Sequence, residues 1–338
     1  MKNQNVSKTH HAVRACLLFF LFTVLGRGAV MAQNPLVATL THNGTMSTFM
    51  GAGALSAAHK AAEPGDVITL SPGTFTGITV TKGVTIRGAG DNTLSSDSLT
   101  QTTLTIDVDS TAGELHVEGI YFSSAIYPIK MYGGGFSCCS INGGVDDNYM
   151  SAFRNVNIER CKIIGYVKLA KECNVFIYNS LTGDPISRDE NTSNFTYMNC
   201  VIEYSWDTST HSSMFTNCVF TCVDGEQVLP ADNSLSHCIG SSTILENFTN
   251  GNNVVAYDRN TVLSIFKTFN GTWEFSEDYQ LTDEAAATYL GDDGTQVGMY
   301  GGANPYSKQL SYPVITRCEV GNRTNEDGTL TVNIEVSQ

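Results

Sequence analysis

Basic residues are scarce in this sequence. Lysine and arginine together number 19 among 338 residues, against 33 aspartates and glutamates, so the formal net charge is −14. A surface of that sign repels both the phosphates of nucleic acid and the headgroups of anionic lipids. We therefore expect neither nucleic acid nor a lipid surface among the partners.

Long hydrophobic runs are also rare. The strongest, residues 15–26 (ACLLFFLFTVLG), is shorter than the roughly 20 residues that span a bilayer, and no later segment is apolar enough to predict a membrane span. Basic residues precede the run, and Val30 and Ala32 supply the small side chains of a cleavage site. We predict a signal peptide at residues 1–32 and export to the periplasm, the cell surface or the medium. Cleavage would leave 15 basic and 33 acidic residues, a net charge of −18.

Metal-binding spacings are missing as well. No Cys-x-x-Cys pair occurs, and Cys218 and Cys222 stand alone without a second pair, which argues against a zinc site. Four histidines have no partner at metal or triad spacing: His42, His59, His116 and His211. Outside the predicted signal there are nine cysteines, an odd number for a disulfide framework.

The cysteines instead follow a repeat of about 20 residues. The anchor positions of five successive units are Cys161, Ser180, Cys200, Cys218 and Cys238. Three residues before each anchor stand Ile158, Ile177, Tyr197, Phe215 and Leu235. One residue before each anchor stand Arg160, Asn179, Asn199, Asn217 and His237. Cys139 and Gly119 continue the anchor spacing towards the N-terminus. Because several columns agree at once, the period is a property of the fold.

The parity of the apolar positions predicts the geometry. Positions −5 and −3 alternate as one face of a strand does, whereas the next apolar positions, 0 and +2, have the other parity. A two-residue arc between short strands produces that change, and asparagine suits such an arc because it tolerates a left-handed backbone. Coils of this kind, stacked ~4.8 Å apart, form a right-handed parallel β-helix. Position +1 is apolar too, so the sequence alone does not decide which residues point into the solenoid.

The same stacking bears on the cysteines. Side chains in successive coils point in parallel, which is poor geometry for a disulfide. We therefore predict that four anchors are buried free thiols, namely Cys161, Cys200, Cys218 and Cys238.

The two ends of such a solenoid need caps, because they expose unpaired backbone. Residues 52–62 are rich in alanine and predict a short helix that ends before Pro64, so we assign residues 33–65 to an N-terminal helical cap. Residues 312–320 and 329–336 flank a turn-rich segment and predict a β-hairpin. We interpret residues 303–338 as a C-terminal hairpin cap, which leaves residues 66–302 for the β-helix of a single all-β domain.

Several segments resemble a known family. Residues 66–77 (DVITLSPGTFTG), followed by residues 84–90 (VTIRGAG), resemble the opening of pectin-lyase-like right-handed β-helix proteins. The Ile-x-Asn-Cys-x-Ile units resemble the coil repeat of that family. Residues 278–281 and 291–302 resemble the final coil of secreted β-helix proteins of Bacteroidetes-like bacteria. The resemblance covers most of residues 60–338 and implies fold and export, but no single activity, because this fold carries many functions.

The resemblance implies two enzyme classes to look for. Hydrolases of this fold resemble one another in four motifs, of which only the Asp-Asp pair occurs here, at residues 146–147 and 292–293, where turn chemistry is the alternative. Lyases hold a uronate through Ca²⁺ beside a basic side chain. The best match is a loop in which Asp184, Asp189 and Glu190 are candidate Ca²⁺ ligands and Arg188 a candidate base or clamp. An exposed polar loop is the alternative.

Two aromatic residues point to a binding function. Tyr204 and Trp206 leave the repeat register and offer a surface on which a sugar ring can stack, although they can also cover the coil below. Our hypothesis is an exported protein that binds a polysaccharide or glycan. The ligand is neutral, or acidic and bound through Ca²⁺, because the candidate loop is itself acidic. The alternatives are a polysaccharide lyase or glycoside hydrolase with an unrecognised active site, and a structural or adhesive surface protein.

Overall fold

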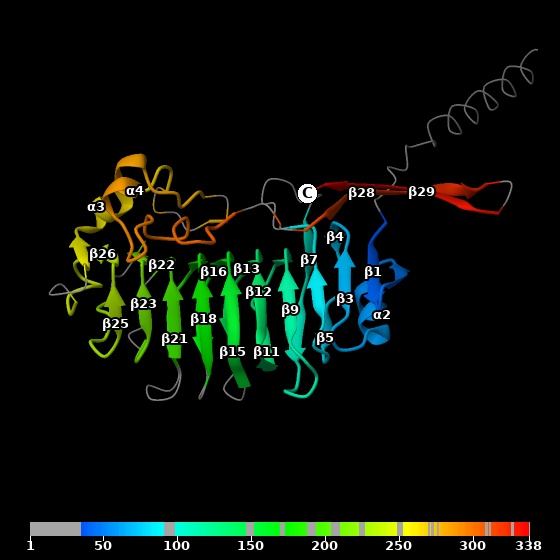
Figure 1. The fold of residues 1–338 in the computed structure, drawn as a ribbon, viewed down its shortest axis with the longest axis horizontal. Helices are drawn as coiled ribbons and strands as arrows, with labels where there is room; N and C mark the ends of the chain where they lie inside the picture. The colour runs from blue at the N-terminus through cyan, green and yellow to red at the C-terminus, as the bar shows by residue number, and fades with distance from the viewer. Residues whose placement is uncertain are drawn as a thin grey trace, which may run out of the picture.

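The protein is a parallel β-solenoid with short helices at its two ends (Figure 1). The computed structural model describes residues 35–338, apart from 91–98, 147–151, 170–172, 188–193, 204–209, 223–226, 249–252, 270, 272–273, 276, 308–309, 311, 326–327 and 338. The predicted signal peptide therefore lies outside the described residues. The all-β parallel solenoid predicted from the repeat is confirmed.

Three stacked sheets make up the solenoid within the described residues. Sheet 1 runs through β2 (Thr45–Met50), β1 (Val37–His42), β3 (Val67–Leu70), β6 (Thr85–Arg87), β9 (Leu115–Glu118), β12 (Gly134–Ser137), β15 (Ala152–Glu159), β18 (Asn174–Tyr178), β21 (Asn194–Met198), β23 (Met214–Thr216) and β25 (Ser234–Ser236), with β5 (Ile78–Val80), β8 (Leu104–Asp107) and β11 (Tyr127–Tyr132) beside this path. Sheet 2 runs through β4 (Gly73–Thr74), β7 (Thr100–Thr102), β10 (Tyr121–Phe122), β13 (Ser140–Asn142), β16 (Lys162–Ile164), β19 (Leu181–Thr182), β22 (Val201–Glu203), β24 (Val219–Thr221), β26 (Ile239–Ser241) and β27 (Val255–Tyr257). Sheet 3 holds β14 (Val145–Asp146), β17 (Val167–Leu169) and β20 (Pro185–Ser187).

A column of left-handed residues joins sheet 1 to sheet 2, as the parity predicted. Arg160, Asn179, Asn199, Asn217 and His237 have φ angles of 52°, 49°, 53°, 57° and 51°. We call these residues, with Asn253 (φ 55°), the arc column. Gly119 was assigned to the anchors, which is wrong by one position: Glu118 pairs with Ser137, so Gly119 (φ 63°) is the arc residue and Ile120 the anchor.

The structure settles which face points inward. In the coil of Cys161 the residues at −5, −3, 0 and +2 are all completely buried in the solenoid: Val156, Ile158, Cys161 and Ile163. The +1 residues belong to a second cluster outside sheet 2: Leu181, Val201, Val219 and Ile239. The sequence showed both apolar stripes because both are buried, on opposite sides of the same strands.

The cysteine ladder has the form that was predicted. Cys161, Cys200, Cys218 and Cys238 are completely buried and form no disulfide. The thiol of Cys200, for example, donates to the carbonyl of Met198 at 3.2 Å. Burial raises the pKa of Cys218 and of Cys238 well above the ordinary value, so these thiols stay protonated and pack as small apolar groups.

The second cluster is covered by a returning segment of the chain, residues 258–306, which we call the strap. It contains α3 (Arg259–Ser264) and α4 (Asp283–Thr288), and its buried side chains include Val262, Phe266, Tyr279, Leu281, Val297 and Met299. Figure 1 shows this segment, in yellow and orange, along the side of the solenoid near β26 and β22. The residues that resembled a final coil thus lie across the outside of sheet 2.

The N-terminal end is covered by a hairpin and a helix. The predicted helix forms as α2 (Ala54–Ala61) and buries Ala54, Leu55 and Ala58 against the first coils. Strand β1 pairs antiparallel with β3, and β2 pairs with β1. No helix in the described part of the chain is long and apolar enough to cross a membrane.

A histidine–aspartate pair fastens the β1–β2 turn to the turn after α2. His42 Nδ1 lies 2.8 Å from Asp66 Oδ1, and Asp66 Oδ2 accepts from the Glu63 N–H at 2.7 Å. The hydrogen bond to Asp66 raises the pKa of His42 above 6.5. Burial tends to raise the pKa of Asp66, but the bonds from Glu63 and His42 outweigh it and lower that pKa below 3.8.

This pair predicts a pH-dependent stability. The His42 contribution is complete below pH 6.5 and is lost as pH rises through the raised pKa, whereas the Asp66 contribution is lost as pH falls through its lowered pKa. We expect His42→Gln to lower Tm at about pH 6 and to have a smaller effect at about pH 8, in thermal unfolding monitored by circular dichroism. His116→Gln is the control, and an equal effect at both pH values would contradict the prediction.

The predicted C-terminal hairpin forms from β28 (Val314–Thr324) and β29 (Leu330–Ser337). The residues that lead into it lie against early coils: Tyr312 donates to the Gly88 carbonyl at 3.4 Å, and the Arg87 guanidinium lies 5.0 Å from the Tyr312 ring centroid. Figure 1 shows the hairpin beside β4 and β1. The chain therefore returns along the solenoid, and its hairpin lies near the end where the solenoid begins.

Candidate functional site

The arc column holds the strap in place through its side-chain amides. Asn179 Nδ2 donates to the Gly301 carbonyl at 2.7 Å. Asn217 Nδ2 donates to Asp292 Oδ1 at 2.8 Å, and Asn217 Oδ1 accepts from the Asp292 N–H at 3.0 Å. An amide can both donate and accept, so a column of asparagines can hold backbone and side-chain groups in turn.

Close approach of the strap to the column depends on glycine. A Cβ at Gly291 would lie 2.6 Å from Asn217 Cγ, a distance that side chains do not tolerate. The neighbouring Asp-Asp pair is occupied by this docking and by its own turn, since Asp293 Oδ1 accepts from the Thr295 N–H at 2.9 Å and the Thr295 hydroxyl at 2.8 Å. These interactions are turn and docking chemistry, the alternative that the sequence offered for this pair.

Beyond the docked turn, the last two arc residues, His237 and Asn253, line a pocket of about 370 Å³. Asn253 Nδ2 lies 2.7 Å from His237 Nε2, and His237 Nδ1 lies 2.9 Å from the Ser236 hydroxyl. An amide nitrogen only donates, so the tautomer of His237 that accepts at Nε2 from Asn253 suits this contact. The pair thus joins an imidazole to an amide, and among the described residues the Asn253 carbonyl oxygen and second N–H make no hydrogen bond.

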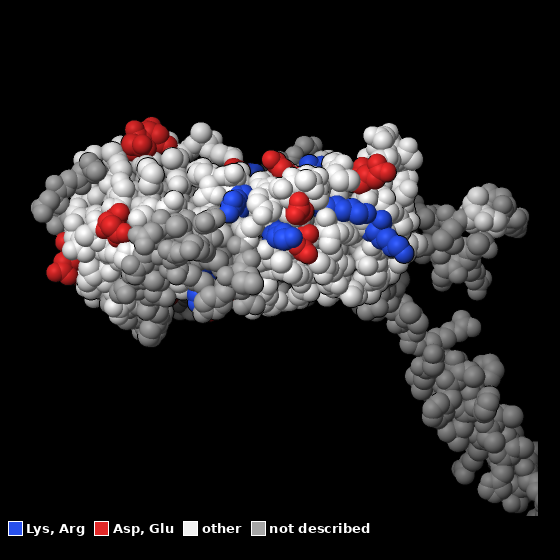
Figure 2. All heavy atoms as spheres, turned by 90° about the horizontal axis from the view of Figure 1, so that it is seen from below, with Lys and Arg blue, Asp and Glu red and all other residues white. Residues whose placement is uncertain are grey.

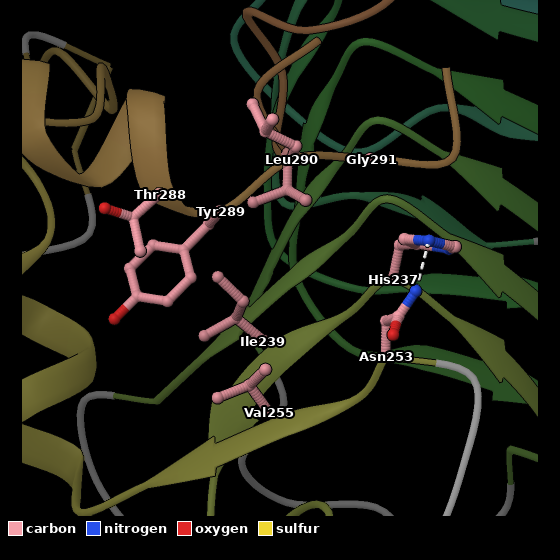
Figure 3. Close-up of a pocket in the computed structure, with 9 residues that line it drawn as sticks. His237, Ile239, Asn253, Val255, Thr288, Tyr289, Leu290 and Gly291 are labelled. Carbon is pink, nitrogen blue, oxygen red and sulfur yellow. Dashed lines mark hydrogen bonds between the residues drawn. The ribbon is translucent and has the colours of Figure 1, made fainter. Parts of the chain in front are cut away.

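The rest of the pocket comes from two parts of the chain (Figure 3). Ile239 and Val255, paired neighbours on β26 and β27, form the floor. Leu290 and Tyr289, which follow α4, face them from the strap. Thr288, Gly291 and Val297 complete the lining. The pocket is thus a gap between the outer face of sheet 2 and the strap.

The tyrosine of the pocket is fixed and stays protonated. Tyr289 donates to the Tyr257 hydroxyl at 3.1 Å, and their ring centroids are 6.1 Å apart. The hydrogen bond with Tyr257, with burial as a further cause, raises the pKa of Tyr289 to about 12. At neutral pH the phenol is therefore an uncharged group that can donate or accept.

Among the described residues that line the pocket there is no aspartate, glutamate, lysine or arginine. Glycoside hydrolysis by the usual route requires two carboxyl groups on either side of the scissile bond, and the pocket lining offers none. Across the described residues, no group of three histidine, cysteine, aspartate or glutamate side chains is placed to hold a metal ion. The described lining therefore offers hydrogen-bonding and apolar groups to a ligand.

Five of the six site residues predicted from the sequence lie in segments that the structure does not describe. Arg188, Asp189, Glu190, Tyr204 and Trp206 lie outside the described residues. The remaining member, Asp184, is buried beside β17, and its carbonyl accepts from the Val167 N–H at 2.9 Å. The possible Ca²⁺ site of this loop therefore stays a prediction.

One feature of the sequence indicates the coil that places His237 beside Asn253. His237 was interpreted as a turn residue, and its left-handed backbone agrees with that role. The triplet Asn253-Val254-Val255 repeats the pattern of residues 217–219 and 237–239 and marks one further coil. Strand β27 occupies that coil and pairs with β26. Recognising it would have placed His237 and Asn253 side by side.

The solvent-facing surface shows no dominant charge on the side seen in Figure 2. Acidic and basic side chains are interspersed there, mainly towards the N-terminal end, and most of the described surface between them is uncharged. Close pairs of opposite sign fit this distribution; Lys130 Nζ, for example, lies 3.8 Å from Asp109 Oδ2.

Comparison with known proteins identifies no relative of this chain. No protein-family model matches the chain, no curated protein matches it, and no solved structure matches it. The parallel solenoid thus rests on the structure itself, and the pectin-lyase-like resemblance stays a prediction from the sequence.

Proposed function

We propose that this protein is exported and binds carbohydrate, and that the pocket at His237 and Asn253 receives a neutral sugar unit. The observation that carries the proposal is the composition of the lining: two hydrogen-bonding arc residues, an apolar floor and no charged side chain. A sugar combines hydroxyl groups with apolar C–H faces, so it needs both kinds of surface in one place.

Both kinds of surface occur in the pocket. The Asn253 amide supplies a donor and an acceptor for neighbouring hydroxyl groups, and its bond to His237 fixes its orientation. Leu290 is exposed, and with Val255 it offers apolar area for a C–H face. A volume of about 370 Å³ lies near the lower limit of ligand pockets, which suits a short stretch of glycan.

Charge favours a neutral ligand over a uronate. The chain carries a net charge of −14, and no cation lines the pocket to offset a carboxylate. Burying an unpaired carboxylate is costly, so a polyuronate would bind here poorly. An acidic glycan stays compatible with the predicted loop at residues 184–190, where Ca²⁺ would bridge the charges.

The proposal is tested with a glycan array, followed by calorimetric titration of the neutral polysaccharides that bind and of polygalacturonate with and without chelator. We expect Asn253→Gly and Leu290→Ala each to weaken binding of the neutral ligand about 10-fold or more, which corresponds to about 1.4 kcal/mol. Glycine is chosen at position 253 because it tolerates the left-handed backbone and removes only the amide.

Met214→Ala is the matched control, since Met214 is another exposed apolar side chain but lies on β23. Equal affinities for all three variants would refute the pocket as the binding site. Reducing-end and unsaturated-product assays run on the same polysaccharides separate binding from cleavage. Product formation that survives Asn253→Gly and Leu290→Ala would favour an enzyme with its site elsewhere. Polygalacturonate binding that resists chelator would favour the lyase alternative.

A further inference from the structure

The strand at the N-terminal end of sheet 1 has an open edge. Strand β2 (Thr45–Met50) is last in the sheet order and, within the described residues, pairs only with β1. Five of its six residues are exposed, and Phe49 is half-buried against the core. Unpaired N–H and C=O groups along such an edge are a template for another strand.

This edge lacks the features that normally prevent pairing. Natural sheets protect their edges with charged side chains, proline or β-bulges. The sequence of β2, TMSTFM, contains no charge and no proline, and its register with β1 runs without interruption from His42–Thr45 to Val37–Met50. Within the described residues the strand is therefore free of bulges, uncharged and accessible.

The hairpin turn determines which backbone groups face outwards. Asn43 and Gly44 (φ 47° and 76°) form a two-residue turn, so the flanking pair, His42 and Thr45, exchanges hydrogen bonds. Hydrogen-bonded pairs alternate with non-hydrogen-bonded pairs along the two strands, so the backbone groups of Ser47 and Phe49 are also hydrogen-bonded to β1. The N–H and C=O groups of Met46, Thr48 and Met50 then point away from β1, towards the open edge.

A second copy of β2 fits this edge in one register. Two strands related by a two-fold axis perpendicular to the sheet run antiparallel and keep their side chains on matching faces. With the axis at Thr48, that residue pairs with its own copy, and Met46 pairs with Met50 of the other copy. All three outward-facing residues of each strand are then hydrogen-bonded.

The side chains favour the same register. Met46 and Met50 are 66% and 56% exposed and lie on one face of β2. The two-fold pairing sets Met46 of one copy directly across from Met50 of the other, as a cross-strand pair. Since β2 has no charge, two copies of this acidic protein can approach there without adding like charges to the contact.

We propose that the protein self-associates through β2 into a two-fold dimer in which sheet 1 continues from one solenoid into the other. A pair of six-residue strands lies at the low end of interface sizes, so the dimer dissociates on dilution. The contact is at the opposite end of the solenoid from the pocket, so it is independent of the proposed carbohydrate binding.

The test is the mass of the purified protein across a concentration series, measured by light scattering on a sizing column and by sedimentation. We expect the mass to rise from monomer towards dimer in the wild type. Thr48→Lys should keep the protein monomeric, because the two-fold register sets the two lysines directly opposite each other. Thr79→Lys is the matched control, an exposed threonine on β5 away from the edge, and should behave as wild type.

Cross-linking tests the register itself. Directly opposed residues of a hydrogen-bonded pair have Cα atoms about 5.5 Å apart, which a disulfide can bridge. Thr48→Cys should therefore form an intermolecular disulfide on oxidation, whereas Ser47→Cys, which opposes Phe49 of the other copy, should form much less. A wild type that is monomeric at every concentration, a dimer that survives Thr48→Lys, or equal cross-linking at both positions would overturn the proposal. A monomeric wild type would favour a strand of another protein as the partner of β2.

Discussion

Replacing Phe215 by alanine is expected to lower the free energy of unfolding by about 3–5 kcal/mol. The side chain is completely buried in the solenoid, stacked on Tyr197 at a centroid distance of 5.3 Å and packed edge-on against Phe220 at 5.1 Å. Alanine leaves a cavity between coils, and each coil of a solenoid is stabilised only by its neighbours. The loss therefore weakens the packing of β23 against Tyr197 of the preceding coil and against Phe220 on β24.

Urea unfolding followed by circular dichroism measures this effect. The control is Met214→Ala, because Met214 precedes Phe215 on the same strand but is 54% exposed. Its expected effect is within about 0.5 kcal/mol of zero. Similar losses for the two variants would show that Phe215 is not part of the core that the inward-facing column defines.

The repeat made the solenoid predictable because its determinants are local. Most coils place apolar residues at −5, −3 and 0, and each has an arc residue between the strands, so the sequence of one coil already indicates its shape. The left-handed backbones of Asn179, Asn199 and Asn217 follow directly from this pattern. The inward face was harder to predict from the sequence, because the +1 residues are also apolar. They are buried by the strap, a segment that follows the repeats in sequence.

The pocket could not be predicted for the same reason. Its floor, Ile239 and Val255, belongs to the repeat, but Tyr289 and Leu290 reach it only because the strap returns across sheet 2. That return depends on docking between distant positions, such as Asn217 with Asp292. A single sequence gives no distance between positions so far apart. The lyase chemistry that the family resemblance implied pointed instead to the acidic loop at residues 184–190, where charged residues cluster.

The strap also explains why the +1 position of the Cys161 coil departs from the apolar stripe. Lys162 occupies the position that Leu181 and Val201 hold in later coils, and it is 2% exposed. Its ammonium donates to the Phe275 and Glu277 carbonyls at 2.8 and 3.0 Å. It also lies 5.6 Å from the ring centroid of Tyr306, within reach of a cation–π interaction. The charge is thus buried together with groups that stabilise it.

Lys162→Leu is therefore expected to destabilise the strap although it restores the apolar stripe. The substitution leaves two carbonyl groups without their ammonium donor, at a cost of about 1–3 kcal/mol for each group that stays buried. Hydrogen exchange followed by mass spectrometry should show faster exchange across residues 274–306, with the sheet 1 strands unchanged.

Lys130→Leu is the control, since Lys130 is an exposed lysine on β11. Unchanged exchange in the strap of Lys162→Leu would mean that apolar packing alone holds it. Faster exchange throughout the solenoid would mean that strap and coils unfold as one unit. Faster exchange confined to the strap would show that the strap, which forms the outer wall of the pocket, is stabilised separately from the coils. Its docking would then set the shape of the proposed sugar site.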